Sequence, residues 1–209
     1  DTEGYQPLLE GSDWNLQAGG KYYVIRNGSS IIAFRIPTAE WKGFQIMASH
    51  SDSPMFKIKE NPEMEAEGHY VKLNVEKYGG MLCAPWFDRP LSVAGRLVVK
   101  EGNQIVTKLV DVKKDLVMIP SLAIHMNRDA NNGVKFNPQK DLLPLYGDET
   151  AKGTFMARIA ELAGVAENDI LAHDLYVYSR TPGSVWGASE EYISCGRLDD
   201  LQCAFSSLE

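Results

Sequence analysis

The chain has 209 residues, of which 44% are hydrophobic and 23% charged, a composition that excludes a disordered protein and can build one large core or two small ones. Its formal net charge is -7, and Lys and Arg form no block, so we expect neither a nucleic-acid partner nor an acidic membrane surface. Its three cysteines have no Cys-x-x-Cys spacing, which excludes a disulfide framework and a structural zinc knuckle.

The first predicted elements are the strands of a β-hairpin. Residues 22–26 and 31–36 are rich in β-branched and aromatic side chains, and Asn27-Gly28 between them is typical of a tight hairpin turn. The apolar residues 43–48 predict a third strand. Near-continuous apolar strands lie in sheets that are covered on both faces, so the pattern predicts the central sheet of an α/β fold, with His50 just beyond a strand end.

The middle of the chain predicts a β-rich domain inserted between the two parts of that α/β fold, over residues 61–172. It contains one amphipathic helix over residues 154–162, which Gly164 ends. An apolar extended stretch at 174–178 then returns toward the first part of the fold. The predicted strands of the insert are residues 70–75, 91–99 and 104–110.

His50 and Asp52 are the first candidates for a functional site. Side chains two apart on an extended strand point to the same side, so the Asp52 carboxylate can hold one imidazole nitrogen while the other faces a metal ion. Without further context, His50 is an ordinary hydrogen-bonded histidine at a strand end. Asp199 would lie near His50 only if the ends of the inserted region close together.

Five separated segments carry a recognisable pattern. They are Ser49-His50-Ser51-Asp52-Ser53-Pro54, Tyr78-Gly79-Gly80, Trp86-Phe87-Asp88-Arg89-Pro90-Leu91, Ile119-Pro120-Ser121-Leu122-Ala123-Ile124-His125-Met126-Asn127-Arg128 and Glu191-Tyr192-Ile193-Ser194-Cys195-Gly196-Arg197-Leu198-Asp199-Asp200-Leu201. In this order they resemble the aspartyl aminopeptidase (aminopeptidase I) family of metallopeptidases. The family usually has Thr where Ser51 stands and Asn where Asp200 stands, and neither difference removes a ligand.

The resemblance implies a two-zinc exopeptidase, in which His50 binds one zinc ion, Asp52 orients His50 and Asp199 bridges both ions. Cobalt or manganese would suit the same ligands. The family's remaining ligands, a Glu-Glu pair, an Asp and a His, lie beyond the position of Asp199, and the ten residues that follow it here contain one Glu and no His. We therefore expect a truncated member with an incomplete site, weak or no zinc binding, and no turnover by this chain alone.

His125 is the second catalytic candidate. By resemblance, it reaches into the active site of a neighbouring subunit, where an imidazole N–H could stabilise an oxyanion. On its sequence context alone, His125 points to solvent while its apolar neighbours Leu122, Ile124 and Met126 pack.

These observations predict a metallo-aminopeptidase that removes N-terminal residues from peptides, acidic ones being the candidate preference, by means of a water molecule that two zinc ions activate. Residues 1–60 and 173–209 would form part of the catalytic domain, and 61–172 the family's dimerisation domain, within a dimer or a larger dimer-based homo-oligomer. The alternative is a non-catalytic assembly module. With no apolar run long enough to cross a bilayer, we expect a cytoplasmic protein.

Overall fold

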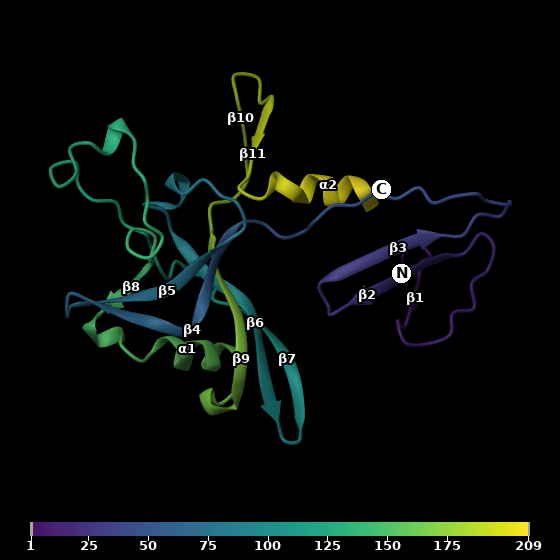
Figure 1. The fold of residues 1–209 in the computed structure, drawn as a ribbon, viewed down its shortest axis with the longest axis horizontal. Coiled ribbons are helices and arrows are strands. Elements are labelled where there is room, and N and C mark those ends of the chain that lie inside the picture. The colour runs from purple at the N-terminus through teal and green to yellow at the C-terminus, as the bar shows by residue number, and fades with distance from the viewer. Residues whose placement is uncertain (1, 209) are drawn as a thin grey trace. The chain divides into compact units, whose positions relative to one another are not determined.

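The computed structural model describes residues 2–208 and divides the chain into two compact units, Asp1–Met47 and Ala48–Glu209. Both units are built mainly of strands (Figure 1). None of the helices among the described residues is long and apolar enough to span a membrane.

The first unit contains a three-stranded sheet in the order β1-β2-β3. Strands β2 (Lys21–Arg26) and β3 (Ser30–Arg35) form the predicted antiparallel hairpin, and β1 (Gln6–Leu8) pairs parallel to β2. The connection between the paired residues Arg26 and Ser30 is a tight turn of three residues, in which Asn27 (φ 53°) and Gly28 (φ 65°) are left-handed. The hairpin prediction is therefore confirmed.

The predicted third strand over residues 43–48 is wrong. This segment carries no strand, and its apolar side chains are exposed, Phe44 and Ile46 to 81% each. An apolar run becomes a strand only where a neighbouring strand takes up its backbone hydrogen bonds, and no described residue pairs with this one. His50 therefore follows a segment without regular secondary structure and not the end of a central strand.

The second unit is organised around a six-stranded sheet in which every pair is antiparallel. Strand β4 changes register between Ile58 and Glu63, around Pro62, which has no N–H to give to the ladder. In order of pairing, the strands are β7 (Gln104–Asp111), β6 (Leu91–Glu101), β9 (Ile170–Ser179), β4 (Met55–Ala66), β5 (Tyr70–Tyr78) and β8 (Leu145–Asp148).

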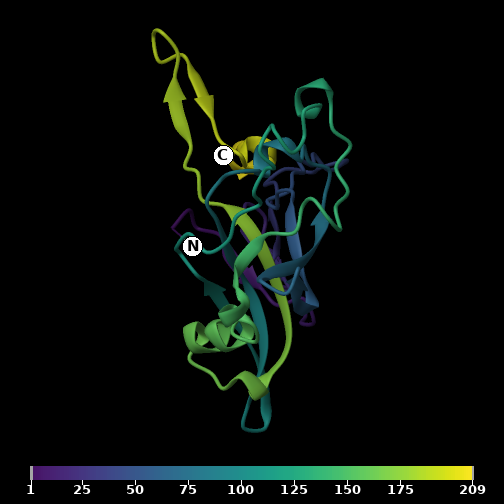
Figure 2. The ribbon, with the colours of Figure 1, turned by 90° about the vertical axis from the view of Figure 1, so that its left-hand side faces the viewer.

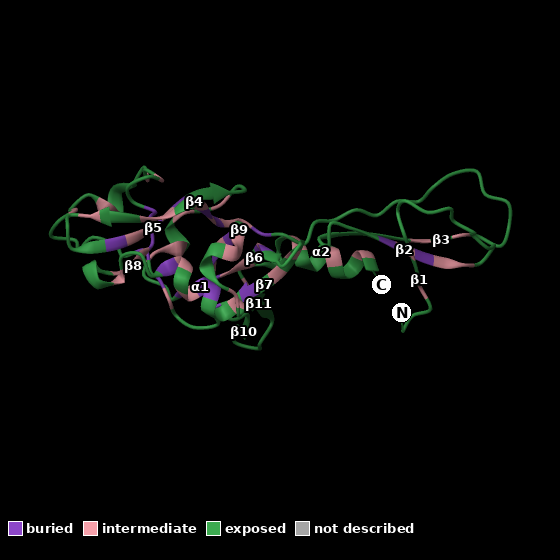
Figure 3. Cartoon of the chain, turned by 90° about the horizontal axis from the view of Figure 1, so that it is seen from below, coloured by how far each residue is buried: buried purple, intermediate pink, exposed green. Residues whose placement is uncertain are grey.

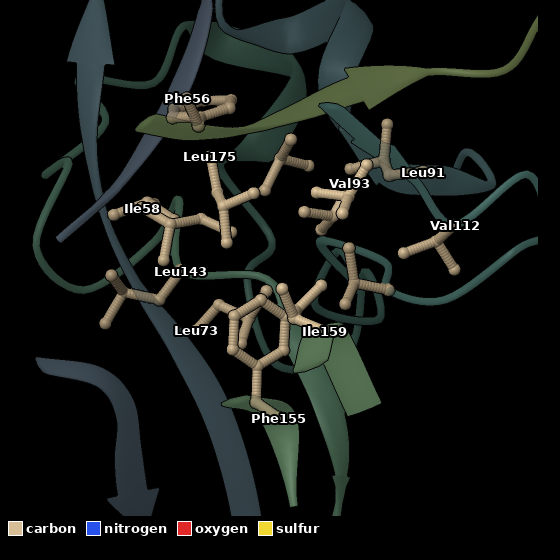
Figure 4. Packing of buried hydrophobic residues seen from close by; sticks show 14 of the residues in the cluster. Phe56, Ile58, Leu73, Leu91, Val93, Val112, Leu143, Phe155, Ile159 and Leu175 are labelled. Atoms are coloured by element: carbon tan, nitrogen blue, oxygen red, sulfur yellow. The ribbon is translucent and has the colours of Figure 1, made fainter. Parts of the chain in front are cut away.

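Helix α1 (Phe155–Ala163) covers this sheet and closes the main core. Its buried side chains Phe155 and Ile159 point toward Leu73 of β5 and the other buried strand residues (Figure 4). The helix ends at Gly164, which is left-handed with a φ of 65°, so the helix predicted over 154–162 is confirmed. Buried residues concentrate in the strands and on one side of α1 (Figure 3).

The segments after β9 leave the core. Strands β10 (Ser184–Trp186) and β11 (Tyr192–Ser194) form an exposed hairpin that projects away from the six-stranded sheet (Figure 2), and helix α2 (Leu198–Leu208), which has no buried residue, follows it. The short 3-10 helices are η1 (Ala84–Trp86), η2 (Ala130–Asn132), η3 (Glu149–Ala151) and η4 (Glu167–Asp169).

Strands β4 and β9 belong to one sheet, so the two ends of the predicted insert, near residues 61 and 172, lie on the same sheet. The assignment of residues 1–60 and 173–209 to part of a catalytic domain, and of 61–172 to a dimerisation domain, stays a prediction.

Candidate metal centre

The candidate site lies within the second unit, where the segment before β4 meets the start of α2. Ser53, only 5% exposed, donates a hydrogen bond from its hydroxyl to the backbone carbonyl of Asp199, at 3.3 Å. The backbone at Asp199 (φ -88°, ψ 110°) and Asp200 (φ -118°, ψ 25°) is not helical, so the regular turns of α2 lie beyond them. A residue 146 positions away along the chain thus anchors Asp199 beside His50.

His50 uses its two ring nitrogens in two directions. Nδ1 lies 3.0 Å from the backbone oxygen of Asp52 and 3.2 Å from its carboxylate Oδ1. Both partners are acceptors, so the neutral imidazole carries its proton on Nδ1 and keeps a lone pair on Nε2. Nε2 lies 3.4 Å from Oδ1 of Asp199. The structure therefore brings His50, Asp52 and Asp199 together.

Asp200 is the third carboxylate around His50. Its Oδ2 accepts a hydrogen bond from the backbone N–H of His50 at 3.2 Å and lies 3.8 Å from Nε2. The Asp200 side chain is only 18% exposed, whereas that of Asp199 is 92% exposed. Asp200 thus fixes the backbone at His50, while the carboxylate of Asp199 is exposed to solvent.

Asp52 is held from its other side by Tyr78, the last residue of β5. The Tyr78 hydroxyl donates a hydrogen bond to Oδ2 of Asp52 at 2.5 Å. Oδ2 of Asp52 thus contacts the phenol, while Oδ1 contacts the imidazole of His50. This short bond to the charged form lowers the pKa of Asp52, and it raises the pKa of Tyr78.

The contacts within the cluster shift the pKa values of Asp52 and Asp200 downward and that of His50 upward. Desolvation lowers the pKa of His50, but the hydrogen bond to the Asp52 carbonyl and the charges of Asp200 and Asp52 outweigh it, so the pKa of His50 is raised. The Cys203 thiol, and then the His50 backbone N–H, lower the pKa of Asp200 by hydrogen bonding. Excess negative charge of this kind suits a cation.

The donor geometry fits a metal ion in part. Zinc holds nitrogen and carboxylate ligands at about 2.0–2.2 Å, which places two tetrahedral donors about 3.3 Å apart. His50 Nε2 and Asp199 Oδ1, at 3.4 Å, match that separation. Within residues 2–208, however, the structure contains no group of three or more His, Cys, Asp or Glu side chains that could hold a metal ion. The described residues supply a pair of donors and not a full coordination shell.

His125 lies elsewhere, in the loop between β7 and β8. A turn with the bond from Met126 N–H to Ala123 O, at 2.8 Å, leaves the His125 side chain exposed. Leu122 is also exposed, to 68%, and Met126 to 76%, so the expectation that the apolar neighbours of His125 pack is not met within this chain. No ion pair or hydrogen bond among the described residues joins His125 to the His50 cluster.

Sequence reasoning assigned no role to Tyr78 or Ser53, and it treated Asp200 only as extra charge. Tyr78 stood in a matching segment, Tyr78-Gly79-Gly80, which was the one available indication of its importance. Ser53 gave no comparable indication, because its partner is a distant backbone carbonyl.

Comparison with known proteins gives one consistent result. The family model described as aminopeptidase I zinc metalloprotease (M18) matches residues 1–209. A probable M18 family aminopeptidase 2 from Clostridium novyi (strain NT) is 44% identical over 217 residues, and a protein of the same name from Clostridium acetobutylicum is 44% identical over 214 residues. These alignments cover 100% and 98% of this chain, but the chain spans only about half of each relative, 50% and 49%.

Solved structures agree with the sequence comparison. A chain in the cryo-EM structure of the Ape4 and Nbr1 complex is 34% identical with a TM-score of 0.89, over 99% of this chain and 44% of that one. The structure of Chaetomium thermophilum mApe1 is 31% identical with a TM-score of 0.86, over 98% of this chain and 50% of that one. The α/β fold class expected from the sequence is confirmed. The chain belongs to the aminopeptidase I zinc metalloprotease family, M18.

Proposed function

We propose that this chain forms part of a metallo-aminopeptidase that removes N-terminal residues from peptides, and that His50 and Asp199 are two of its metal ligands. The observation that carries the proposal is the 3.4 Å separation of His50 Nε2 and Asp199 Oδ1 in a cluster of carboxylates. Membership of a zinc metalloprotease family supports the same reading.

Each residue of the cluster has a distinct part in this proposal. Asp52 accepts a hydrogen bond from Nδ1 of His50 and so leaves the Nε2 lone pair free to bind a metal ion. Asp199, whose carboxylate is exposed, has a second oxygen with which to bridge to another ion. Two zinc ions would supply Lewis acidity that polarises a scissile carbonyl and lowers the pKa of a water molecule. Cobalt or manganese would suit the same donors.

The 209 residues supply only part of the machinery in this proposal. The family resemblance implies further carboxylates and a histidine, including a glutamate that moves the proton, and the described residues offer no third converging ligand. This chain alone is then expected to bind zinc weakly and not to turn over substrate.

His125 belongs to the proposal as an oxyanion-stabilising residue that acts on the active site of a neighbouring subunit. Its exposure on a loop with exposed Leu122 and Met126 supports a role that needs a partner surface. Catalysis would then require a homo-oligomer, either a dimer or a larger dimer-based assembly. One solved relative is a Saccharomyces cerevisiae mApe1 dodecamer, 27% identical with a TM-score of 0.77.

We also propose a cytoplasmic location and a preference for acidic N-terminal residues. Three free thiols, at Cys83, Cys195 and Cys203, support a reducing compartment. The preference for acidic residues rests on the family resemblance alone.

The test joins this chain in frame to the part of the Clostridium novyi relative that the alignment does not cover, and assays the purified hybrid with zinc or cobalt on a panel of aminoacyl anilides. We expect turnover, highest on an acidic residue, that falls by at least about 10³-fold in His50→Ala and Asp199→Ala variants. His69→Ala, an exposed histidine in the β4–β5 turn, is the matched control. Full activity in the His50→Ala hybrid would overturn the site. A folded, oligomeric but inactive hybrid would favour the assembly module.

A further inference from the structure

Tyr78 differs from the other residues of the cluster in where it is anchored. It ends β5 and pairs with Met55 of β4, and its ring packs edge-on against Tyr176 of β9, with the ring centroids 5.8 Å apart. Gly79, left-handed with a φ of 76°, lies against Pro54, where an added Cβ would come within 3.4 Å of the proline ring. Three strands of the core sheet therefore fix the position of the phenol.

The segment that carries His50 and Asp52 has no such support, because residues 47–54 form neither helix nor strand. Both side chains are about half exposed. The 2.5 Å bond from the Tyr78 hydroxyl to Asp52 Oδ2 is thus the side-chain contact that ties the Asp52 carboxylate to the rigid sheet. It leaves Oδ1 facing His50 Nδ1 at 3.2 Å, beside the Asp52 carbonyl oxygen, which lies 3.0 Å from the same nitrogen.

We propose that Tyr78 is a positioning residue: by holding the carboxylate, its hydroxyl fixes Asp52 as a whole, so that the carbonyl and carboxylate oxygens of Asp52 both face Nδ1 of His50. Asp52 thereby selects the Nδ1–H form and leaves Nε2 bare toward Asp199. This inference rests on the proposed function at one point only, which is that the bare Nε2 serves to bind a metal ion. The geometry itself is a property of the metal-free chain.

A merely structural role for Tyr78 makes a different prediction. Phenylalanine at this position keeps the ring, its packing on Tyr176 and the strand pairing, and it removes only the hydroxyl. If the ring alone matters, His50 keeps its tautomer in Tyr78→Phe. If the hydroxyl positions Asp52, the imidazole loses its preference although the fold is retained.

The experiment reads the tautomer directly by long-range ¹H–¹⁵N NMR of the imidazole rings in the metal-free 209-residue chain, at about pH 9, where imidazoles are neutral. His50 is assigned from the His50→Ala spectrum. We expect the wild-type chain to show the Nδ1–H form at His50 in more than about 80% of molecules. In Tyr78→Phe we expect that share to fall by at least about half, with unchanged backbone amide shifts in the six-stranded sheet.

Tyr176→Phe is the matched control, since it removes a hydroxyl from the ring that packs on Tyr78 and leaves the bond to Asp52 in place. The inference is overturned if Tyr78→Phe keeps the wild-type tautomer, or if Tyr176→Phe shifts it equally. The wild-type spectrum is a test by itself, because a predominant Nε2–H form at His50 would contradict the inference even if the variant fails to fold. No metal or substrate is added, so an inactive hybrid enzyme would leave this result standing.

Discussion

The Glu63 carboxylate, on strand β4, accepts a hydrogen bond from the backbone N–H of Phe155, the first residue of helix α1, at 2.8 Å. Its other oxygen accepts from the N–H of Gly153 at 2.6 Å. Backbone N–H groups at a helix N-terminus have no partner within the helix, and the Thr154 side chain does not cap these two. A residue 92 positions earlier in the chain therefore caps α1 and fixes the helix to the sheet.

Glu63→Ala is expected to lower the free energy of unfolding by about 1–3 kcal/mol, because it leaves two backbone donors without a partner and removes a negative charge from a helix N-terminus. Glu63→Gln keeps one acceptor oxygen and should lose less. Urea unfolding followed by circular dichroism measures both. Glu161→Gln, at an exposed position of α1, is the control, and an equal loss there would refute the capping role.

Gly95→Ala should disrupt the pairing of β6 with β9. A Cβ at Gly95 would collide with the carbonyl oxygen of Asp174, on the neighbouring strand, and come within 2.9 Å of the Leu175 Cα. Because backbone atoms cannot move aside cheaply, we expect a loss of about 1–3 kcal/mol or more in urea unfolding. Gly80→Ala, where an added Cβ meets nothing within 4 Å, should leave stability nearly unchanged. A tolerated Gly95→Ala would contradict the pairing.

Acid should weaken the middle of the six-stranded sheet through Asp174, on β9. Lys57, and then Arg96, bind its carboxylate and lower its pKa. A carboxyl group whose folded pKa is depressed stabilises the fold above its unfolded pKa of about 3.9, and that stabilisation is lost as the pH falls through the folded pKa. All three side chains are partly exposed, so the contribution is about 1 kcal/mol at most.

The measurement is the free energy of unfolding in urea at several pH values from neutral down to acid. Asp174→Asn should be less stable than wild type at neutral pH, and the difference should shrink as the pH falls below about 3.9. Asp169→Asn, at a partly exposed acid on η4 that forms no ion pair among the described residues, should show no such convergence. A constant difference at all pH values would mean that the ion pairs do not contribute.

Asp88 should control the order of the loop that carries His125. Its Oδ1 accepts the backbone N–H of Ser121 at 2.8 Å, and hydrogen bonds from the Ser121 hydroxyl and N–H lower the pKa of Asp88. Asp88→Ala is expected to speed amide hydrogen exchange at residues 121–128 by at least about tenfold, while the β-sheet core keeps its protection.

Asp88→Asn is the comparison variant, because asparagine keeps an acceptor oxygen and tolerates the positive φ of 55° at this position. It should retain most of the wild-type protection. Equal exchange in wild type and Asp88→Ala would show that the loop is held by other contacts.

Much of the fold could be predicted from the sequence, because its strands and helix carry local patterns. The turn at Asn27-Gly28 and the stop at Gly164 each need only a few neighbouring residues to be recognised. The strand predicted over residues 43–48 was wrong because an apolar pattern does not indicate whether a partner strand is present. Helix α2 was not predicted, because its second and third residues, Asp199 and Asp200, are not helical and were interpreted as part of a site motif.

The candidate site was predictable only where its contacts are local or where a family pattern supplied them. His50 and Asp52 are two residues apart, so their contact follows from spacing, although the strand that we expected is absent. The bond from Tyr78 to Asp52 spans 26 residues, and the one from Ser53 to Asp199 spans 146. Such long-range contacts depend on the register of the folded sheet, which no local pattern specifies.

The most direct test of the central claim, that His50 and Asp199 form one metal site, is Mn²⁺ titration of the ¹⁵N-labelled 209-residue chain by NMR, since paramagnetic broadening reports even weak binding. We predict broadening centred on residues 50–53 and 197–203, lost in His50→Ala and in Asp199→Asn and kept in His69→Ala. Broadening that is centred elsewhere, or that persists unchanged in both site variants, would contradict the account.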